Sequence, residues 1–330
     1  MSRGSDSFEI DDFRGSDSGS GRDVSRGPSS DWNKRIDLHN IHREEDRADR
    51  LDREGRQRSD SDRPFVPREE RVQMILARRT RTNYVDRNKT YSLRDSEMHA
   101  LSEIGKFRVV ATSDLVRFAY NGDHARTEND IANLSRQGVV KRISIADSDL
   151  SPIRVVTLTK EGHKVLPRGR FLRPGQVTYH GLKKPKEAFH DAELYHLYHK
   201  VSDEIEERGG KVVRVKLDFE IKRDLYADLA QALRDNSKNP ETVKDIVASR
   251  HGLKVVDREI QIPDLRLEHA NDPDMDIHRL DLELATEHYR PRGLAAKARA
   301  GFQIYARRGE TDPLRRIRDE RELSAAIFSL

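Results

Sequence analysis

The sequence predicts an α+β or α/β protein in which a disordered N-terminal tail precedes two folded parts. Three observations support this prediction. Residues 1–70 consist mainly of Ser, Gly, Arg and Asp, residues 92–166 change from helical to alternating periodicity, and residues 185–330 mix both periods. Because a segment with few apolar side chains cannot bury enough surface to fold, the core must come from the two later parts.

The composition limits the class of protein. Of 330 residues, 35% are hydrophobic and 36% are charged, which allows two modest cores. The net charge of +4 is only a weak indication of nucleic-acid binding, so this question depends on local clusters of basic residues. The absence of cysteine excludes disulfides and thiolate metal sites. No apolar run is long enough for a membrane span or a signal peptide, so we expect a cytoplasmic protein with no membrane partner.

Residues 71–91 form a predicted basic arm. Arginines at 78, 79 and 81 precede tyrosines at 84 and 91. Basic and aromatic side chains in alternation suit contact with phosphates and bases, as in an arm beside a DNA-binding domain. A solubilising linker is the alternative.

Residues 92–166 predict three helices and a two-stranded hairpin. The first helix begins at Ser92 or Asp95 and ends at Gly105, the second begins at 112–114, and the third runs from 123 or 124 to 137. Alternating apolar residues at 139–145 and 154–158 predict the hairpin strands. Three helices followed by a two-stranded wing are the winged-helix pattern.

Two short sequences strengthen this interpretation by resemblance. Asn133-Leu-Ser-Arg-Gln-Gly-Val-Val140 and Leu158-Thr-Lys-Glu-Gly-His163 resemble the recognition-helix exit and the post-wing segment of winged-helix DNA binders. Exposed polar residues of a recognition helix read base edges, and basic residues of a wing contact phosphates. The base-reading candidates are His124, Arg126, Thr127, Asn129, Asn133 and Arg136, and the phosphate candidates are Lys141, Arg142 and Arg154. The alternative is a protein-docking module, because the same helix carries Glu128 and Asp130.

A basic linker at 167–184, rich in Gly and Pro, predicts a boundary before the second part, 185–330. A helix is expected at 185–208, a strand at 212–221, and helices at 225–233 and 240–250. His190 lies near the start of the first helix, and Glu220 lies on the strand. Surface exposure is the ordinary alternative for Glu220.

Two further strands and a helix carry the main chemical signal. Apolar residues alternate in 259–268 and in 277–285, and the turn formers at 271–274 allow the two strands to pair antiparallel. That pairing places Asp264 beside Glu283. A helix from 293 to 306 then presents Lys297 at the edge of its buried face, and a last helix is expected at 320–330. Two carboxylates on one face suit Mg²⁺ or Mn²⁺, which can activate water against a phosphodiester.

The order of strand with Pro-Asp, strand with Glu and helix with Lys resembles the PD-(D/E)xK nuclease core, and more closely the plasmid replication-relaxation family, in which a winged helix precedes such a core. The resemblance implies that Asp264 and Glu283 bind the metal, with Lys297 stabilising charge and His190 or Glu220 assisting. It also implies partners: double-stranded DNA and plasmid replication or transfer proteins.

One position departs from that motif. The usual lysine lies two residues after the second carboxylate, where this sequence has Ala285. Lys297 would then have to reach the site from the following helix. Two alternatives therefore stay open: a non-catalytic winged-helix regulator whose nuclease-like domain forms a homodimer or docks a partner, and an adaptor that binds no nucleic acid.

Overall fold

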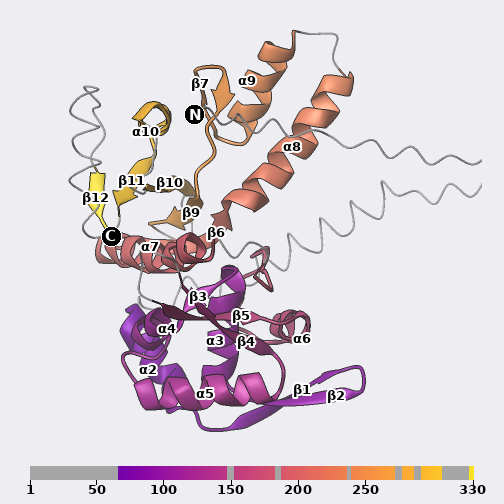
Figure 1. The fold of residues 1–330 in the computed structure, drawn as a ribbon, viewed down its shortest axis with the longest axis vertical. Helices are drawn as coiled ribbons and strands as arrows, with labels where there is room; N and C mark the ends of the chain where they lie inside the picture. Colours follow the sequence, from indigo (N-terminus) through magenta and orange to yellow (C-terminus); the bar gives the residue numbers. More distant parts are fainter. Residues whose placement is uncertain are drawn as a thin grey trace, which may run out of the picture. The chain divides into compact units, whose positions relative to one another are not determined.

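The computed structural model describes residues 66–146, 152–182, 187–235, 239–271, 277–285, 291–306 and 327–330. All of the elements described here belong to one compact unit, residues 57–330 (Figure 1). The predicted disordered tail lies outside these residues up to position 65. Within the described residues, no helix is both long enough and apolar enough to cross a lipid bilayer.

The predicted basic arm contains a helix and a hairpin. Helix α2 spans Arg68–Ala77, and strands β1 (Arg81–Asp86) and β2 (Lys89–Arg94) pair antiparallel. Tyr91 and Leu93 are 2% and 1% exposed, because they lie on the hairpin face that joins the core. The buried Tyr91 side chain is therefore unavailable for stacking on a base. The alternation that forms β2 was hidden among the arginines and polar residues of this segment.

Three helices follow, close to the predicted positions. They are α3 (Asp95–Lys106), α4 (Thr112–Ala119) and α5 (His124–Arg136). The Glu97 side chain accepts the Arg94 N–H at 2.7 Å, and Asp123 accepts the Arg126 N–H at 2.9 Å, so polar side chains satisfy the free N–H groups of α3 and α5. Leucines on their inner faces are fully buried.

A three-stranded sheet of order β3-β5-β4 completes this part. The predicted hairpin is β4 (Val140–Ile145) and β5 (Ile153–Leu158), paired antiparallel. The third strand, β3 (Val110–Ala111), is too short to show a periodicity in sequence. Helix α6 (Lys160–Val165) and a 3-10 turn η1 (Leu166–Arg168) come next.

A five-stranded mixed sheet forms the second part, in the order β12-β11-β10-β9-β6. Its strands are β6 (Lys211–Leu217), β9 (Leu265–Ala270), β10 (His278–Ala285), β11 (Gln303–Ala306) and β12 (Ile327–Ser329). Strands β6, β9 and β10 pair antiparallel, whereas β10, β11 and β12 pair parallel. A small separate hairpin consists of β7 (Val255–Val256) and β8 (Glu259–Ile260).

Four helices accompany this sheet: α7 (Ala188–Glu207), α8 (Asp218–Asp235), α9 (Pro240–Arg250) and α10 (Pro291–Ala300). The predicted helix at 240–250 is confirmed. Several predicted elements were wrong in their bounds or type. The strand expected over 259–268 is interrupted, because Glu259–Ile260 belongs to β8 and β9 begins only at Leu265, so Asp264 lies in the loop before β9. Residues 218–221 begin α8 and do not continue the strand. The Lys297 helix stops at Ala300, because Gly301 adopts a φ of 93° and the chain re-enters the sheet as β11. Ile327–Ser329 is a strand, where a helix was expected.

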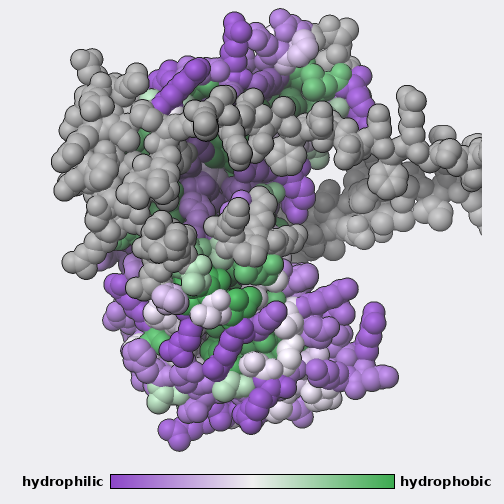
Figure 2. Space-filling model, in the orientation of Figure 1, coloured by the Kyte–Doolittle hydropathy of each residue, from purple (hydrophilic) through white to green (hydrophobic). Residues whose placement is uncertain are grey.

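One hydrophobic cluster runs through both parts, and α7 lies within it. Tyr195 packs edge-on against Phe107 at 5.2 Å between ring centroids, and His199 stacks on Phe118 at 4.4 Å. From the same helix, Leu194 and Leu197 share that cluster with Leu265 and Leu282. Figure 2 shows apolar surface where the described residues of the two parts meet. The two parts therefore share a core.

The predicted basic linker is packed onto both parts. The Tyr179 N–H donates to the Gly105 carbonyl at 2.7 Å. The Gln176 side chain donates to the Val215 carbonyl at 2.9 Å and accepts the Val215 N–H at 3.1 Å. Because β6 is an edge of the five-stranded sheet, Gln176 satisfies backbone groups that would otherwise be free there.

Candidate functional site

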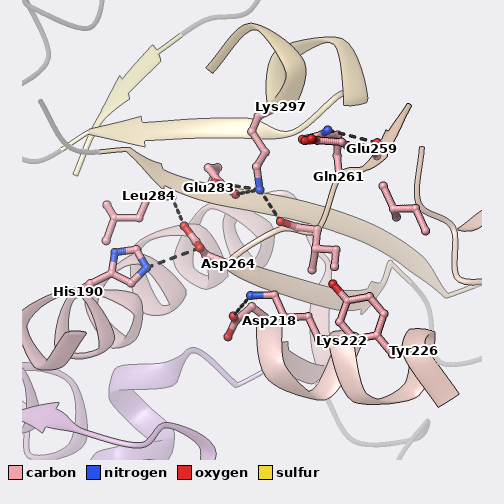
Figure 3. A pocket seen from close by; sticks show the side chains of 12 residues that line it. His190, Asp218, Lys222, Tyr226, Glu259, Gln261, Asp264, Glu283, Leu284 and Lys297 are labelled. Atoms are coloured by element: carbon pink, nitrogen blue, oxygen red, sulfur yellow. Dashed lines mark hydrogen bonds and ion pairs between the residues drawn. The ribbon is translucent and has the colours of Figure 1, made fainter. Parts of the chain in front are cut away.

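A polar pocket of about 480 Å³ lies where α7, α8 and α10 meet the start of β9 and the end of β10. It brings together four of the residues singled out from the sequence: His190, Asp264, Glu283 and Lys297 (Figure 3). These four side chains come from two helices, a loop and a strand. The antiparallel pairing of β9 and β10 is what places Asp264 next to Glu283, since Leu265 lies opposite Leu282.

Asp264 is fixed by two contacts. One carboxylate oxygen accepts the Leu284 N–H at 2.9 Å, and the other lies 3.6 Å from His190 Nε2. Burial raises the pKa of Asp264, but the His190 charge and the Leu284 N–H outweigh burial and lower it below its ordinary value. Burial likewise lowers the pKa of His190, yet Asp264 raises it to about 9. At neutral pH the pair is therefore an imidazolium and a carboxylate.

Lys297 reaches the site from α10. Its ammonium donates to a Glu283 carboxylate oxygen at 3.1 Å and also to the Ile262 carbonyl. The same nitrogen lies 5.3 Å from the centre of the Phe302 ring. Glu283 is only 2% exposed, so its charge needs this partner. The Lys297 ammonium therefore lies against the Glu283 carboxylate and the Ile262 carbonyl.

Position 285 explains why the lysine comes from the helix. Ala285 is fully buried and belongs to a cluster with Leu294, Ile304 and Ala306. Helix α10 supplies Leu294, and β11 supplies the other two. A lysine at 285 would need its ammonium inside this apolar cluster, which is very costly. A side chain on α10 avoids that cost.

Among the pocket residues that the sequence did not identify, three lie on α8. Asp218, Lys222 and Tyr226 line it from the first turns of α8. Lys222 donates to Asp218 at 2.7 Å. Their spacing of four residues is the signal that a helix face carries them, but the strand expected to run to Ile221 hid it.

Glu220 was expected to be a third carboxylate at this site, and the structure places it elsewhere. It lies on α8, is 1% exposed, pairs with Arg214 and accepts the Tyr179 hydroxyl at 3.1 Å. Burial raises the pKa of Glu220, although Arg214 acts in the opposite direction. The side chain is absent from the lining of the pocket. Its role is to hold the linker residue Tyr179 against α8.

Two carboxylates of the pocket are the type of ligand that a hard divalent cation takes. Asp264 and Glu283 offer carboxylate oxygens, and the Ile262 carbonyl already accepts a cationic group. Within the described ranges, no cluster of three or more His, Asp or Glu side chains is arranged to hold a metal ion. A cation here would therefore keep several waters, as Mg²⁺ does in proteins.

The residues predicted to read base edges lie on α5, and the structure exposes only some of them. His124, Asn129 and Arg136 are exposed. Thr127 is fully buried, and its hydroxyl donates to the Asp123 carbonyl at 2.7 Å, so it cannot read a base. Asn133 is half-buried and donates to Glu97 at 2.7 Å.

The Arg126 side chain points toward α3, since its guanidinium group lies 3.4 Å from the Ser96 hydroxyl and 3.9 Å from the Asp130 carboxylate. The exposed face of α5 is thus narrower than the sequence indicated. Helical spacing places Ala125 and Ala132 on the same face as Asn129 and Arg136. These small side chains carried no signal in the sequence.

The predicted phosphate contacts on the hairpin are all exposed. Lys141 lies on β4 and is open to solvent. Arg142 and Arg154 flank Glu128 of α5 at 3.2 and 3.9 Å. One carboxylate between two guanidinium groups leaves a net positive charge beside α5. Such exposed pairs are weak and can exchange for a phosphate.

Comparison with known proteins identifies no family. No family model matches the chain, and no curated protein matches it. Among solved structures, the crystal structure of Bacillus subtilis PadR in complex with operator DNA aligns with 47% of this chain and 88% of that chain, at 12% identity and a TM-score of 0.19. A similarity this low establishes neither a common fold nor a common function.

Proposed function

We propose that this protein binds double-stranded DNA through a winged helix and that its C-terminal part is a PD-(D/E)xK-like domain that cleaves a phosphodiester with a divalent metal. In this role it would nick or relax DNA in plasmid replication or transfer. The observation that carries the proposal is the convergence of Asp264, Glu283 and Lys297 on one pocket, from positions distant in sequence. Carboxylates that bind a metal and an ammonium group that stabilises developing charge can together support hydrolysis of a phosphodiester.

Each side chain has a distinct role in this proposal. Asp264 and Glu283 would hold Mg²⁺ or Mn²⁺, which would supply an activated water. Lys297 already contacts Glu283 and lies where it can stabilise the negative charge that develops on the phosphate. His190 keeps the Asp264 carboxylate ionised and fixes its orientation. It acts as a positioning residue.

DNA recognition is proposed for α5 and the β4–β5 hairpin. Asn129 and Arg136 are exposed on one face of α5, and the alanines beside them leave room for close approach to a groove. Lys141 and the two arginines around Glu128 would contact phosphates.

A plasmid-nicking assay tests the catalytic part. Supercoiled plasmid is incubated with the full chain and Mg²⁺ or Mn²⁺, beside Asp264→Ala and Glu283→Ala. We expect conversion of the plasmid to its open-circular form only when the wild-type protein and a metal are both present. Glu241→Ala, an exposed carboxylate at the start of α9, is the matched control and should cleave normally. The proposal fails if the wild type does not cleave, or if both site variants cleave as it does.

One observation favours a second candidate, a non-catalytic DNA-binding regulator with a degenerate nuclease-like domain. Asp264 is already neutralised by His190, and Glu283 by Lys297. A network of paired charges also stabilises a domain used only for dimerisation or for docking a partner. Sedimentation of the full chain separates these roles. A Mg²⁺-independent homodimer without nicking activity supports this second candidate.

A further inference from the structure

One side of α8 carries polar and aromatic side chains that lead away from the proposed active site. Asp218, Lys222 and Tyr226 are four residues apart, so they share one face of the helix. All three line the same pocket as Asp264, and Figure 3 shows them along its lower wall. We call them the α8 stripe.

The start of the stripe is fixed beside Asp264. The Asp218 N–H donates to the Asp264 carbonyl at 3.1 Å, which joins the first residue of α8 to the loop that carries the site. An α-helix rises about 1.5 Å per residue, so Lys222 lies roughly 6 Å and Tyr226 roughly 12 Å farther along the helix axis than Asp218. The stripe thus forms a track that begins at the carboxylates and runs outward.

The two outer side chains of the stripe are accessible to a ligand. The side chain of Lys222 is 45% exposed, and Tyr226 is 54% exposed. Burial lowers the pKa of Lys222, but the hydrogen bond and charge of Asp218 outweigh burial and raise it, so the ammonium is charged at neutral pH. A charged amine can pair with a phosphate, and an exposed aromatic ring one helical turn away can stack on a base. Lys222 and Tyr226 therefore match the phosphate and the base that repeat along a nucleic acid strand.

The arrangement of Lys222 and Tyr226 favours a single strand over a duplex. In a duplex the face of each base is covered by its neighbours, so a tyrosine beside the backbone finds no base to stack on. Proteins that bind single strands combine basic side chains along the backbone with aromatic side chains that stack on bases. The α8 stripe has one of each.

We infer that the α8 stripe binds an unpaired stretch of DNA that leads into the pocket, with Lys222 at a phosphate and Tyr226 stacked on a base. The inference rests on the proposed function and narrows its substrate to DNA with an unpaired segment next to the phosphodiester. Asp218 positions Lys222 and does not contact the strand.

Binding is measured with the full chain and a fluorescein-labelled oligothymidine, by anisotropy in EDTA so that no cleavage occurs. Tyr226→Ala should weaken binding by about 5- to 100-fold, the usual effect of removing one stacked aromatic. Tyr226→Phe keeps the ring and should bind within about twofold of wild type. Leu233→Ala removes another exposed apolar side chain of α8, outside the pocket, and serves as the matched control.

Three results would overturn the inference: no binding of oligothymidine by the wild type, equal binding by the wild type and Tyr226→Ala, or equal losses in Tyr226→Ala and Tyr226→Phe. A failure of the proposed function looks different. If the wild type nicks no plasmid and yet binds oligothymidine through Tyr226, the cleavage proposal fails and the single-strand site stands. If Asp264-dependent nicking occurs and Tyr226→Ala binds normally, only the α8 stripe is excluded.

Discussion

The ammonium of Lys297 lies 3.1 Å from the Glu283 carboxylate, although the two residues belong to a helix and a strand that are separated in sequence by a segment outside the described residues. Helix α10 covers the end of β10, so a residue near the middle of the helix meets the strand face that carries Glu283. Lys297 thereby brings to Glu283 a charge that position 285 cannot supply, because Ala285 is buried in an apolar cluster with Leu294. Under the proposed function, position 297 takes over the role of the usual motif lysine.

Replacing Lys297 by Met should lower the nicking rate by about 10²- to 10³-fold, because the developing phosphate charge loses its stabilising cation. Lys297→Arg should keep partial activity, since the charge remains but its geometry changes. Single-turnover nicking rates with Mg²⁺ measure both. Arg292→Met removes an 85% exposed cationic side chain from the same helix and is the control. Equal rates for Lys297→Met and wild type would exclude a catalytic lysine.

Moving the lysine back to its usual place should fail. In the double variant Ala285→Lys with Lys297→Ala, the new side chain would enter the apolar cluster under α10. An uncompensated buried charge costs several kcal/mol, so we expect a large loss of unfolding free energy and no recovery of nicking. Urea denaturation and the nicking assay report on the two effects. A stable, active double variant would show that α10 does not block this position.

The sequence predicted the parts of this fold that have local causes. The helix at 240–250 has Pro at its first position and Asn239 as its N-cap, and the structure confirms it. The alternation in 277–285 identifies β10, and the turn formers before it imply antiparallel pairing with β9, which the structure confirms. From these two strands alone, Asp264 and Glu283 could be placed side by side.

The remaining errors have non-local causes. β11 and β12 are short, and they form because each has a parallel partner: β11 pairs with β10, and β12 pairs with β11. A periodicity of a few residues cannot distinguish such a strand from the continuation of a helix. The same holds at Asp218, where an alternating sequence changes to a helix beside Asp264. Asp218, Lys222 and Tyr226 follow that boundary. Because the end of the strand was misplaced, their helical spacing was not recognised and they were not predicted to line the pocket.

Gly162 is required by a close backbone approach. A Cβ at this position would lie 2.0 Å from the Val139 carbonyl oxygen, which accepts the Thr159 N–H at 3.0 Å. We therefore expect Gly162→Ala to lower the free energy of unfolding by about 1 to 3 kcal/mol, as overpacking does. Chemical denaturation measures the loss. Lys160→Ala, exposed on the same helix, should unfold as the wild type does. Identical transitions for both variants would contradict the close approach.

Acid should destabilise the contact between α3 and α7. Burial lowers the pKa of His99 from 6.5 to about 4, more than the nearby Glu103 raises it, and burial also lowers the pKa of His199. Between these pKa values each of the two histidines binds more protons in the unfolded chain than in the folded chain, so the stability that each contributes falls as the pH falls. From about pH 7 to about pH 5 the contribution of His99 to the free energy of unfolding should drop by roughly 1 to 3 kcal/mol. His190 and Asp191, whose pKa values are raised to about 9 and about 6, act in the opposite direction.

Urea denaturation at both pH values measures this drop, and His99→Gln should reduce it. His124→Gln, which alters an exposed histidine, should leave the drop unchanged. The same change of stability with pH in the wild type and in His99→Gln would mean that His99 does not take up a proton on unfolding.

DNA binding by α5 should depend on its exposed face. Arg136→Ala removes an exposed cation and should weaken binding to a duplex by about 5- to 100-fold. If Arg136 contacts a phosphate, the slope of log affinity against log salt should also fall by about 1. Anisotropy with a labelled duplex over a salt series measures both. Arg250→Ala, an exposed arginine at the end of α9, is the matched control. An affinity that does not change with salt would mean that no phosphate is contacted. Helix α5 would then serve to dock a protein through exposed residues such as Glu128, and not through Asp130, which is buried and accepts hydrogen bonds from Arg94 and Ser96.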